Sequence, residues 1–382
     1  MSLAGPPVVT LPLPAGGIQL AGAREKTRDC SSTLRILQKN FSLSLSLDAT
    51  LHSMTKKFAS QFRGLLLACA AGMFVVGCSP HQTPNGLTKI KLQTDWYPQP
   101  EHGGFYDALL KGYYKDEGLD VEIVPGGPYT IAEQQVSTGA AQFAMGSSDR
   151  ILEAISNGQP LVAVGATMQH DPQAVMVHKQ SSVKLLSDLD GRTVAIKPGS
   201  TWFTYLAQRY QLKNVREVPA TYSVANFIHD PDYIQQIFVT SEPFYAKKAG
   251  VEIRTLLISD TGYDPYRVFF TTQVFATEHP DIVAKFVRAS LHGWRDYLSD
   301  PSTANTAISN LNPAMNKDQM QFTWQALKDG HFVDGSDPSG AQVGQLDPAR
   351  WSSMYRLLLS LKVLQRPFYA PSAYTMRLLK GN

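Results

Sequence analysis

The sequence predicts an α/β protein of two lobes, each built on a doubly wound sheet and joined by two crossing strands. From residue 89 onward, strand-like and helix-like segments alternate, which is typical of parallel sheets with helices on both faces. The alternation is broken near residues 170–178 and 265–273, where one apparent strand follows another. After His279 the pattern becomes helical. Two extended crossings between two α/β series indicate a body with a hinge.

The first lobe is predicted to comprise residues 89–170 and 270–382, and the second residues 171–269. The first series has strand-like segments at 88–96, 119–124, 141–148 and 161–169, with helices at 105–117, 130–139 and 149–158. The second has strands at 173–179, 193–199, 215–220, 235–240, 251–258 and 267–273, with helices at 201–211 and 242–250 and a polar helix before 235. Helices at 279–301, 316–330 and 347–364 complete the chain and are expected to return to the first lobe.

The composition is that of an ordinary globular protein. The chain has 382 residues, of which 43% are hydrophobic and 18% charged, with a net formal charge of +3. This length suffices for two domains or one large one. Of the 35 Lys/Arg and 32 Asp/Glu residues, eight and three precede Cys78, so the remainder has a net charge of −2. Because nucleic-acid binders cluster their basic residues, we expect no nucleic-acid partner.

The region before Cys78 has the pattern of a secretory signal. In "MTKKFASQFRGLLLACAAGMFVVGC", which starts at Met54, a cationic stretch precedes an apolar run that ends in small residues. The run is shorter than the about 20 residues that cross a bilayer. "VVGC" resembles a bacterial lipobox, which implies that Cys78 carries a lipid anchor; a short buried core helix is the alternative.

The signal divides the front of the chain into three parts. Residues 1–53 are interpreted as an unstructured leader or an over-extended gene start, residues 54–77 as the signal peptide, and residues 78–88 as a tether. Cys30 and Cys69 both precede Cys78, so the exported part would have no pair of cysteines to join. We therefore expect it to be held together without disulfides.

The loop "DWYPQPEHGG" after the first strand contains more side-chain chemistry than a connection needs. Ligands of open α/β sheets bind at the carboxyl ends of strands, and this loop lies at such an end. Trp96 is a candidate to stack on a flat ring and Asp95 to accept a hydrogen bond from an amine. His102 precedes two glycines, which would let a ligand approach the backbone. A packed Trp or His and a capping Asp are the structural alternatives.

Two serine-containing turns each join a strand to a helix. In "GSSD", Ser147 and Ser148 offer hydroxyls next to the free amides of a helix N-terminus, a site for polar or anionic atoms. "PGSTW" repeats this design in the second lobe with Gly199, Ser200 and Thr201. Simple N-capping is the alternative in both turns.

Three more candidates come from the second lobe. Glu242, in "TSEP", could accept the ring nitrogens and amine of an aminopyrimidine, or merely favour the positive end of a helix. Tyr263 and Tyr266, in "GYDPYR", are candidates for the two faces of an aromatic sandwich, or for filling the hinge. The histidines show no metal-ligand spacing, so we expect no metal and no cofactor.

Three segments, "DWYPQPEHGGFYDALLKGYYKDEGLDVEI", "STGAAQFAMGSSDRI" and "TSEPFYAKKAGVEI", resemble substrate-binding proteins of bacterial ABC importers. Within that group the resemblance is to proteins that handle thiamine-pyrimidine precursors, nitrate, taurine and alkanesulfonates, and it covers residues 89–380. It implies a type II periplasmic-binding-protein fold that closes on its ligand. In a related enzyme, "PGSTW" corresponds to a segment at a phosphate group.

That related enzyme is a fungal pyrimidine synthase that uses pyridoxal phosphate, and this sequence departs from it. By motif spacing, the enzyme's cofactor lysine corresponds to a position near Gly146 and its histidine to one near Arg150. Its cysteine-rich metal loop corresponds to "GYDPYRVFF", which contains no cysteine. A Schiff base requires a lysine amine and a thiolate site requires cysteine. The resemblance therefore favours a binding protein over the enzyme.

The resulting prediction is a lipid-anchored solute-binding protein of the cell envelope that delivers a small ligand to ABC permease and ATPase subunits. The ligand is expected to be heteroaromatic, such as a thiamine pyrimidine precursor, and the protein a monomer without enzymatic activity. Three alternatives remain: a pyrimidine-synthase-like enzyme, a binder of nitrate- or sulfonate-type anions, and a sensor or docking domain without transport.

Overall fold

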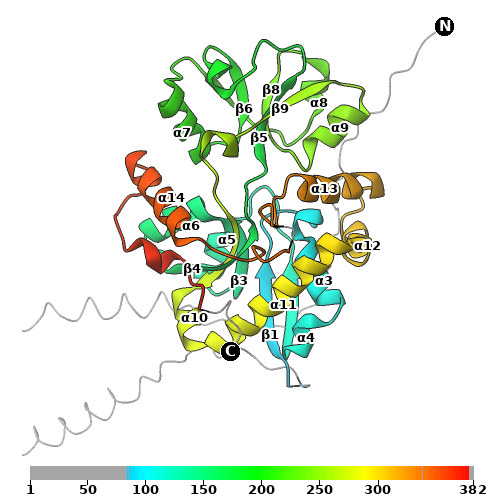
Figure 1. Cartoon of the computed structure of the whole chain (residues 1–382), viewed down its shortest axis with the longest axis vertical. Helices are drawn as coiled ribbons and strands as arrows, with labels where there is room; N and C mark the ends of the chain where they lie inside the picture. Colours follow the sequence, from blue (N-terminus) through cyan, green and yellow to red (C-terminus); the bar gives the residue numbers. More distant parts are fainter. Residues whose placement is uncertain (1–83, 85, 338, 378–382) are drawn as a thin grey trace, which may run out of the picture. The chain divides into compact units, whose positions relative to one another are not determined.

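The computed structural model describes residue 84, residues 86–337 and residues 339–377 of the chain (Figure 1). The predicted leader, signal peptide and lipidation site at Cys78 lie outside the described residues, as does most of the predicted tether. By its internal contacts, the chain divides into two units, Met1–Gly77 and Cys78–Asn382. Everything described below belongs to the second of these units.

Sheet A contains five strands in the order β2–β1–β3–β10–β4. Their bounds are β1 Thr88–Gln93, β2 Leu119–Val124, β3 Phe143–Ser147, β4 Leu161–Met168 and β10 Arg267–Thr272. β1 pairs in parallel with β2 and β3, whereas β10 runs antiparallel between β3 and β4. The alternating pattern predicted a parallel first sheet. The sheet is mixed because the strand after the second crossing enters it between two parallel strands.

Sheet B also contains five strands, in the order β7–β6–β8–β5–β9. Their bounds are β5 Gln173–His178, β6 Thr193–Ile196, β7 Arg216–Pro219, β8 Ile234–Phe238 and β9 Ile253–Leu257. β6 is parallel to β7 and β8, and β5 runs antiparallel to β8 and β9. Ala174 and Met176 of β5 pack into one core cluster and Val175 and Val177 into another, because alternate side chains leave opposite faces of a strand.

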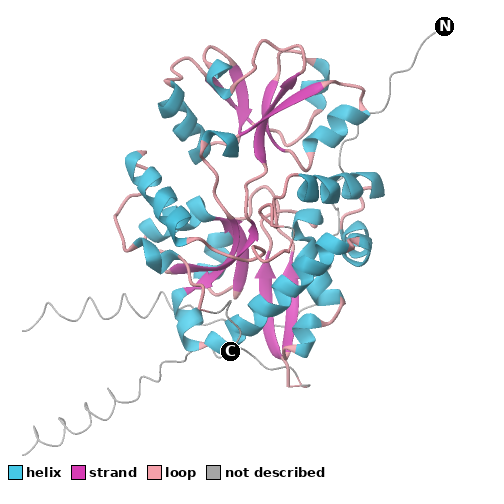
Figure 2. Cartoon of the chain, in the orientation of Figure 1, coloured by secondary structure: helices cyan, strands magenta, loops and turns pink. Residues whose placement is uncertain are grey.

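Helices surround both sheets (Figure 2). Their bounds are α3 Gly103–Leu110, α4 Tyr113–Asp116, α5 Ala132–Ser137, α6 Ser148–Ser156, α7 Thr201–Tyr210, α8 Ala225–His229, α9 Glu242–Lys248, α10 Gln273–Glu278, α11 Pro280–Ser299, α12 Ser302–Leu311, α13 Lys317–Asp329 and α14 Pro348–Ser360; short 3-10 turns are η1 Pro100–His102, η2 Leu186–Leu189, η3 Ser259–Thr261 and η4 Ala370–Ala373. The helix predicted over 105–117 is divided, because Gly112 has the left-handed φ of 86°.

The two faces of sheet A are covered by different helices. On one face, Leu92 of β1 shares a core cluster with Phe286 and Trp294 of α11. On the other, Ala144 of β3 shares a cluster with Leu152 of α6 and Leu358 of α14. The C-terminal helices therefore complete the first lobe, although they are distant in sequence from most of its strands.

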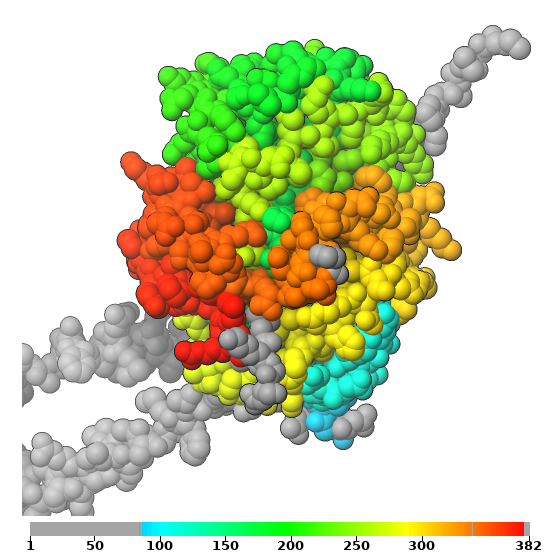
Figure 3. All heavy atoms as spheres, viewed as in Figure 1, coloured from blue at the N-terminus to red at the C-terminus, as the bar shows by residue number. Residues whose placement is uncertain are grey.

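Helix α13 also contacts the second lobe. The segment that contains α13, orange in Figure 3, lies against the yellow-green segment that contains α9. The rings of Phe244 and Phe322 have centroids 5.8 Å apart, and the Thr323 hydroxyl donates a 2.6 Å hydrogen bond to the carbonyl of Thr240. The two sheets are thus the cores of two lobes that touch beside α13. The predicted residue limits of the lobes stay a prediction.

Candidate functional site

Asp95 lies at the centre of a polar cluster at the carboxyl edge of sheet A. One carboxylate oxygen is 3.1 Å from Nε2 of His102, and the other forms an ion pair with Arg267. Burial alone would raise the pKa of Asp95, but the Arg267 guanidinium and the His102 hydrogen bond outweigh it and hold this pKa well below its usual range. Asp95 is therefore charged, and its side chain is 24% exposed.

A second acidic group joins the lobes beside this cluster. Glu101 is 6% exposed, its Oε1 accepts a 2.6 Å hydrogen bond from the Thr240 hydroxyl, and its Oε2 has no partner among the described residues. Burial raises the pKa of Glu101. Glu242, the first residue of α9, accepts a 2.9 Å hydrogen bond from the Phe238 amide. Burial and, to a lesser extent, the nearby Glu101 raise the pKa of Glu242 to about 7, so its carboxyl can take up a proton near neutral pH.

Trp96 is held by its backbone while its ring remains half-buried. The Trp96 carbonyl accepts hydrogen bonds of 3.0 Å from the Gly126 amide and 2.9 Å from the Thr94 hydroxyl. Its ring centroid is 5.7 Å from that of Tyr97 and 5.0 Å from that of Tyr222. Tyr222 follows β7, so this contact brings together loops from the carboxyl edges of both sheets.

The two glycines after His102 serve the fold. A Cβ at Gly103 would overlap the ring of Tyr297, and one at Gly104 would overlap Trp294, both from α11. The space expected for a ligand is therefore occupied by a packed helix. His102 is itself fully buried, and its role in the structure is the hydrogen bond to Asp95.

Ser147 and Ser148 have different surroundings. The Ser148 hydroxyl accepts a 3.0 Å hydrogen bond from the Tyr266 amide, and the Ser148 amide donates one of 2.9 Å to the Tyr266 carbonyl. Ser148 thus ties α6 to the second crossing, while Asp149 accepts a 2.9 Å hydrogen bond from the Arg150 amide in the first turn of α6. The Ser147 hydroxyl has no hydrogen-bond partner among the described residues, and Ser147 pairs with Arg267 across the sheet.

The two tyrosines of the second crossing pack against different partners. The Tyr263 hydroxyl donates a 2.6 Å hydrogen bond to Asp149, and its ring lies 5.3 Å from that of Tyr205. The ring of Tyr266 lies beneath Arg350, whose guanidinium carbon is 3.8 Å from the ring centroid. Both tyrosines are buried, at 1% and 3% exposed. Their rings are not paired with each other, which favours the hinge-filling alternative over a sandwich.

The turn before α7 keeps the expected open geometry. Gly199 has a φ of 73°, and a Cβ there would meet nothing within 4 Å. The Ser200 hydroxyl donates a 2.6 Å hydrogen bond to the Lys197 carbonyl instead of capping the helix. The Thr201 amide has no acceptor among the described residues. Burial, together with the positive charges of Arg150 and Arg267, lowers the pKa of Lys197, although Lys197 is exposed in the structure. The guanidinium groups of Arg150 in α6 and Arg267 in β10 therefore lie near this turn.

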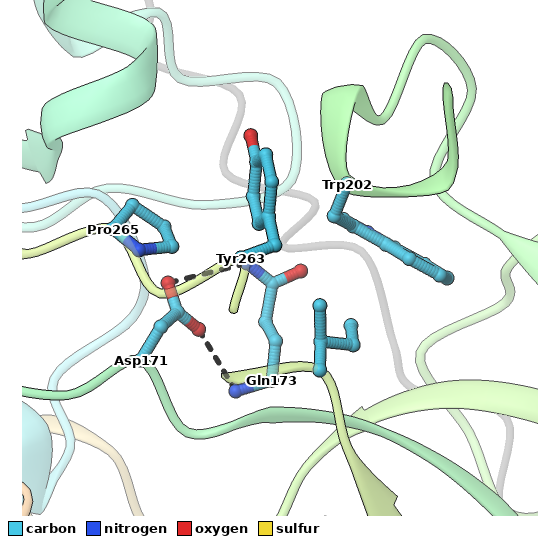
Figure 4. Close-up of a pocket in the computed structure, with 6 residues that line it drawn as sticks. Asp171, Gln173, Trp202, Tyr263 and Pro265 are labelled. Carbon is cyan, nitrogen blue, oxygen red and sulfur yellow. Dashed lines mark hydrogen bonds between the residues drawn. The ribbon is translucent and has the colours of Figure 1, made fainter. Parts of the chain in front are cut away.

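A small pocket lies at the crossings and not at the polar cluster (Figure 4). Asp171, Gln173, Trp202, Ile258, Tyr263 and Pro265 line it. Its empty volume of about 150 Å³ is below the roughly 300–1,000 Å³ of ligand pockets. Burial raises the pKa of Asp171 to about 6, and Asp171 accepts a 2.8 Å hydrogen bond from the Gln173 amide. This pocket is part of the hinge.

Four residues that we did not predict contribute to the site: Glu101, Lys197, Tyr222 and Arg267. Arg267 carried a usable signal, since an arginine at the start of the apolar strand "RVFF" needs a charged partner when it is buried. Glu101 lies in the singled-out loop. Lys197 and Tyr222 lie in turns whose neighbours depend on how the two sheets face each other.

Two kinds of feature are absent from the described residues. No helix there is both long enough and apolar enough to cross a membrane. Within the same residues, no group of three or more His, Cys, Asp or Glu side chains is placed to hold a metal ion.

Comparison with known proteins identifies relatives of two kinds. Riboflavin-binding protein RibY of Chloroflexus aurantiacus is 24% identical over 79% of this chain and 89% of its own length. The formylaminopyrimidine-binding protein of Halalkalibacterium halodurans is 25% identical over 81% of this chain and 96% of its own. A 4-amino-5-hydroxymethyl-2-methylpyrimidine phosphate synthase of Saccharomyces cerevisiae is 24% identical over 60% of this chain and 73% of its own.

Solved structures and a family model complete the assignment. The alkanesulfonate-binding protein SsuA of Xanthomonas axonopodis pv. citri, bound to MOPS, has a TM-score of 0.56 at 14% identity, covering 75% of this chain and 98% of its own. This similarity confirms the predicted two-lobed periplasmic-binding-protein fold. The model described as NMT1/THI5 like matches residues 99–304, which is more than half of the chain. The chain therefore belongs to the NMT1/THI5-like family.

Proposed function

We propose that the protein is the solute-binding component of an ABC importer and that it captures a flat, nitrogen-containing heteroaromatic ligand for delivery to permease and ATPase subunits. The observation that carries this proposal is the half-buried ring of Trp96, which is next in the chain to the charged Asp95 and 5.0 Å from the ring of Tyr222. A ring stacked on Trp96 would find an acceptor for its amine or ring N–H groups in the Asp95 carboxylate.

The names of two relatives support this ligand class, because riboflavin and formylaminopyrimidine are both flat nitrogen heterocycles. Micromolar affinity requires a net binding free energy of about −8 kcal/mol, which one stacked ring and several satisfied hydrogen bonds can supply. Closure of the two lobes about the crossings would bring Glu242 and the turn at Gly199–Thr201 toward a ligand held by lobe 1.

Small molecules released from freshly purified, denatured protein should include a heteroaromatic compound, detectable by mass spectrometry. Calorimetric titration should then give micromolar or tighter binding for that compound. A parallel titration with nitrate and an alkanesulfonate serves as the control. Binding of those anions in preference to every heteroaromatic ligand would contradict the proposal and favour the anion-binding alternative.

The synthase alternative follows from the yeast relative, and two features of this chain oppose it. Gly146 lies in β3 near the position expected for a cofactor lysine, and a Cβ there would already be 3.2 Å from the Phe270 ring. The sequence contains no cysteine after Cys78. Purified protein should therefore show neither pyridoxal absorbance nor bound iron. Conversion of a candidate solute by the isolated protein would contradict the binding-only function.

The membrane anchor is a separate part of the proposal, and it depends on the sequence before Ser79. We propose that Cys78 is lipidated and that the protein acts outside the cytoplasm as a monomer. Protein expressed from Met54 should partition with membranes, and a Cys78→Ser variant should not be lipidated. Equal release of both forms into the soluble fraction would remove the anchor from the proposal while leaving ligand binding unaffected.

A further inference from the structure

Tyr222 is the aromatic residue closest to Trp96 that comes from the other lobe. The two ring centroids are 5.0 Å apart and the ring planes are inclined by 55°. Building on the proposed function, we propose that Tyr222 is the second wall of the ligand site. Its ring covers Trp96 in the ligand-free protein and closes over the opposite face of a planar heteroaromatic ligand once the ligand has bound to Trp96.

The present spacing leaves no room for a ligand between the two rings. Stacked aromatic carbons approach to about 3.5 Å, so a ring between two others needs walls about 7 Å apart. The observed separation is 5.0 Å. One of the two walls must therefore move before a planar ligand can lie between them.

Trp96 is the fixed wall. The Gly126 amide and the Thr94 hydroxyl both donate to its carbonyl, and the Thr94 hydroxyl also accepts a 3.1 Å hydrogen bond from the Gly126 amide. Gly126 lies so close to the Trp96 loop that a Cβ would overlap the Thr94 carbonyl. The loops after β1 and β2 thus hold the Trp96 backbone between them.

Tyr222 is the wall that can move. Among the described residues, the backbone groups of Thr221, Tyr222 and Ser223 have no hydrogen-bond partners, and neither does the Tyr222 hydroxyl. Tyr222 is 43% exposed and has a φ of 56°, a left-handed conformation that is unusual for an aromatic residue. Such conformations are concentrated at ligand clamps and switch regions. The loop can therefore reposition its ring without breaking ordered backbone contacts.

The chemistry around this pair matches an aromatic ligand. Tyr97 is 51% exposed and Tyr129, in the loop after β2, is 96% exposed. Burial is the main cause that raises the pKa of Tyr222. A smaller contribution comes from Tyr129, which is near enough to raise this pKa further when its hydroxyl is ionised. Exposed aromatic rings from three loops favour a ligand with an apolar planar face and offer little to nitrate or a small sulfonate.

The first test needs no ligand. Removing the Tyr222 ring should make Trp96 more accessible to acrylamide, which quenches tryptophan fluorescence. The part of the quenching that is due to Trp96 is the part that disappears when Trp96 is replaced by Phe in the same variant. Tyr222→Gly and Tyr222→Ala are compared because glycine also relieves the left-handed backbone, so an effect seen in both comes from the missing ring. Unchanged quenching of Trp96 in both variants would overturn the covering role.

The second test measures binding, with riboflavin and 4-amino-5-hydroxymethyl-2-methylpyrimidine as probes. For whichever probe the wild-type protein binds, Tyr222→Gly should weaken binding about three- to tenfold, the range for one aromatic stacking contact, mainly through faster dissociation. Tyr222→Phe should bind as the wild type does. Tyr369→Ala is the matched control, because Tyr369 is also exposed, at 76%, and makes no ring contact among the described residues.

The outcomes separate the two proposals. Unchanged or tighter binding by Tyr222→Gly, with wild-type binding intact, would overturn the wall assignment and leave the proposed function in place. Failure of the wild-type protein to bind either probe or any co-purified heteroaromatic would remove both. A double-mutant cycle with Trp96→Ala should be non-additive, because each ring holds the ligand against the other; additive losses would contradict the clamp.

Discussion

Asp95 and Arg267 form an ion pair that joins the loop after β1 to the first residue of β10, 172 positions later in the sequence. Their side chains are 24% and 14% exposed. Because β10 follows the second crossing between the lobes, this pair fixes the start of that strand at the carboxyl edge of sheet A. The same edge carries Trp96 and Ser147, so a structural contact also shapes the candidate site.

Arg267→Gln should destabilise the protein strongly, because it leaves Asp95 and its neighbours without a compensating cation. Breaking a buried ion pair costs about 3–5 kcal/mol, and partial exposure should place this loss at about 3 kcal/mol in urea unfolding. Asp95→Asn combined with Arg267→Gln should recover part of it. Lys91→Gln is the matched control, since Lys91 and Glu122 form an exposed pair 3.6 Å apart. Equal losses in the two single variants would contradict the structural role of Arg267.

Trp96→Ala should weaken binding of the heteroaromatic ligand at least about tenfold, because it removes a stacking contact and apolar area together. Its half-buried ring lies outside the core clusters, so the midpoint of thermal unfolding should hardly change. Trp96→Phe should lose less affinity. Calorimetry and thermal unfolding measured on the same samples check both parts, and an unchanged dissociation constant would exclude Trp96 from the site.

Gly126→Ala should disturb the Trp96 loop, since its Cβ would overlap the Thr94 carbonyl, which is backbone and cannot turn away. We expect a loss of stability of about 1–3 kcal/mol together with weaker ligand binding. The adjacent Gly127→Ala is a matched control, because a Cβ there would lie 3.5 Å from the Tyr97 ring, an ordinary contact. Equal effects of the two substitutions would show that the close approach at Gly126 does not position Trp96.

Stability should fall as the pH rises from about 4 to 7. The pKa of Glu242 is raised from 4.5 to about 7 and that of Asp171 from 3.8 to about 6, so the folded protein holds protons that the unfolded chain has released. Their stabilising contribution is complete below the unfolded pKa values and is lost as the pH passes the folded ones. Urea unfolding at several pH values measures this slope.

Two variants test the assignment of that pH dependence. Glu242→Gln combined with Asp171→Asn should flatten the slope between pH 4.5 and 7. Asp188→Asn should leave the slope between pH 5 and 7 unchanged, because backbone hydrogen bonds from Lys184 and Leu185 lower the pKa of Asp188 and place its titration below that range. A slope that survives the double substitution would assign the pH dependence to other groups.

The individual elements were predictable because their patterns are local. The strand predicted at 119–124 is β2 with the same bounds, and the helix predicted at 201–211 is α7 to within one residue. Helices α10 and α12 were not predicted, and the prediction of a parallel first sheet was wrong because β10 runs antiparallel between β3 and β4. Strand periodicity shows which segments are strands, but the pairing of strands depends on tertiary contacts.

By itself, the sequence determined the alternating α/β elements, the two crossings and the loop that carries Asp95, Trp96 and His102, because each follows from residues close together in the chain. The tertiary structure decided what those side chains do. His102 became a buried partner of Asp95, Gly103 and Gly104 became contacts for α11, and Arg267 and Tyr222 joined the site from distant segments. These roles depend on burial and on charges brought together by packing, which no local pattern encodes.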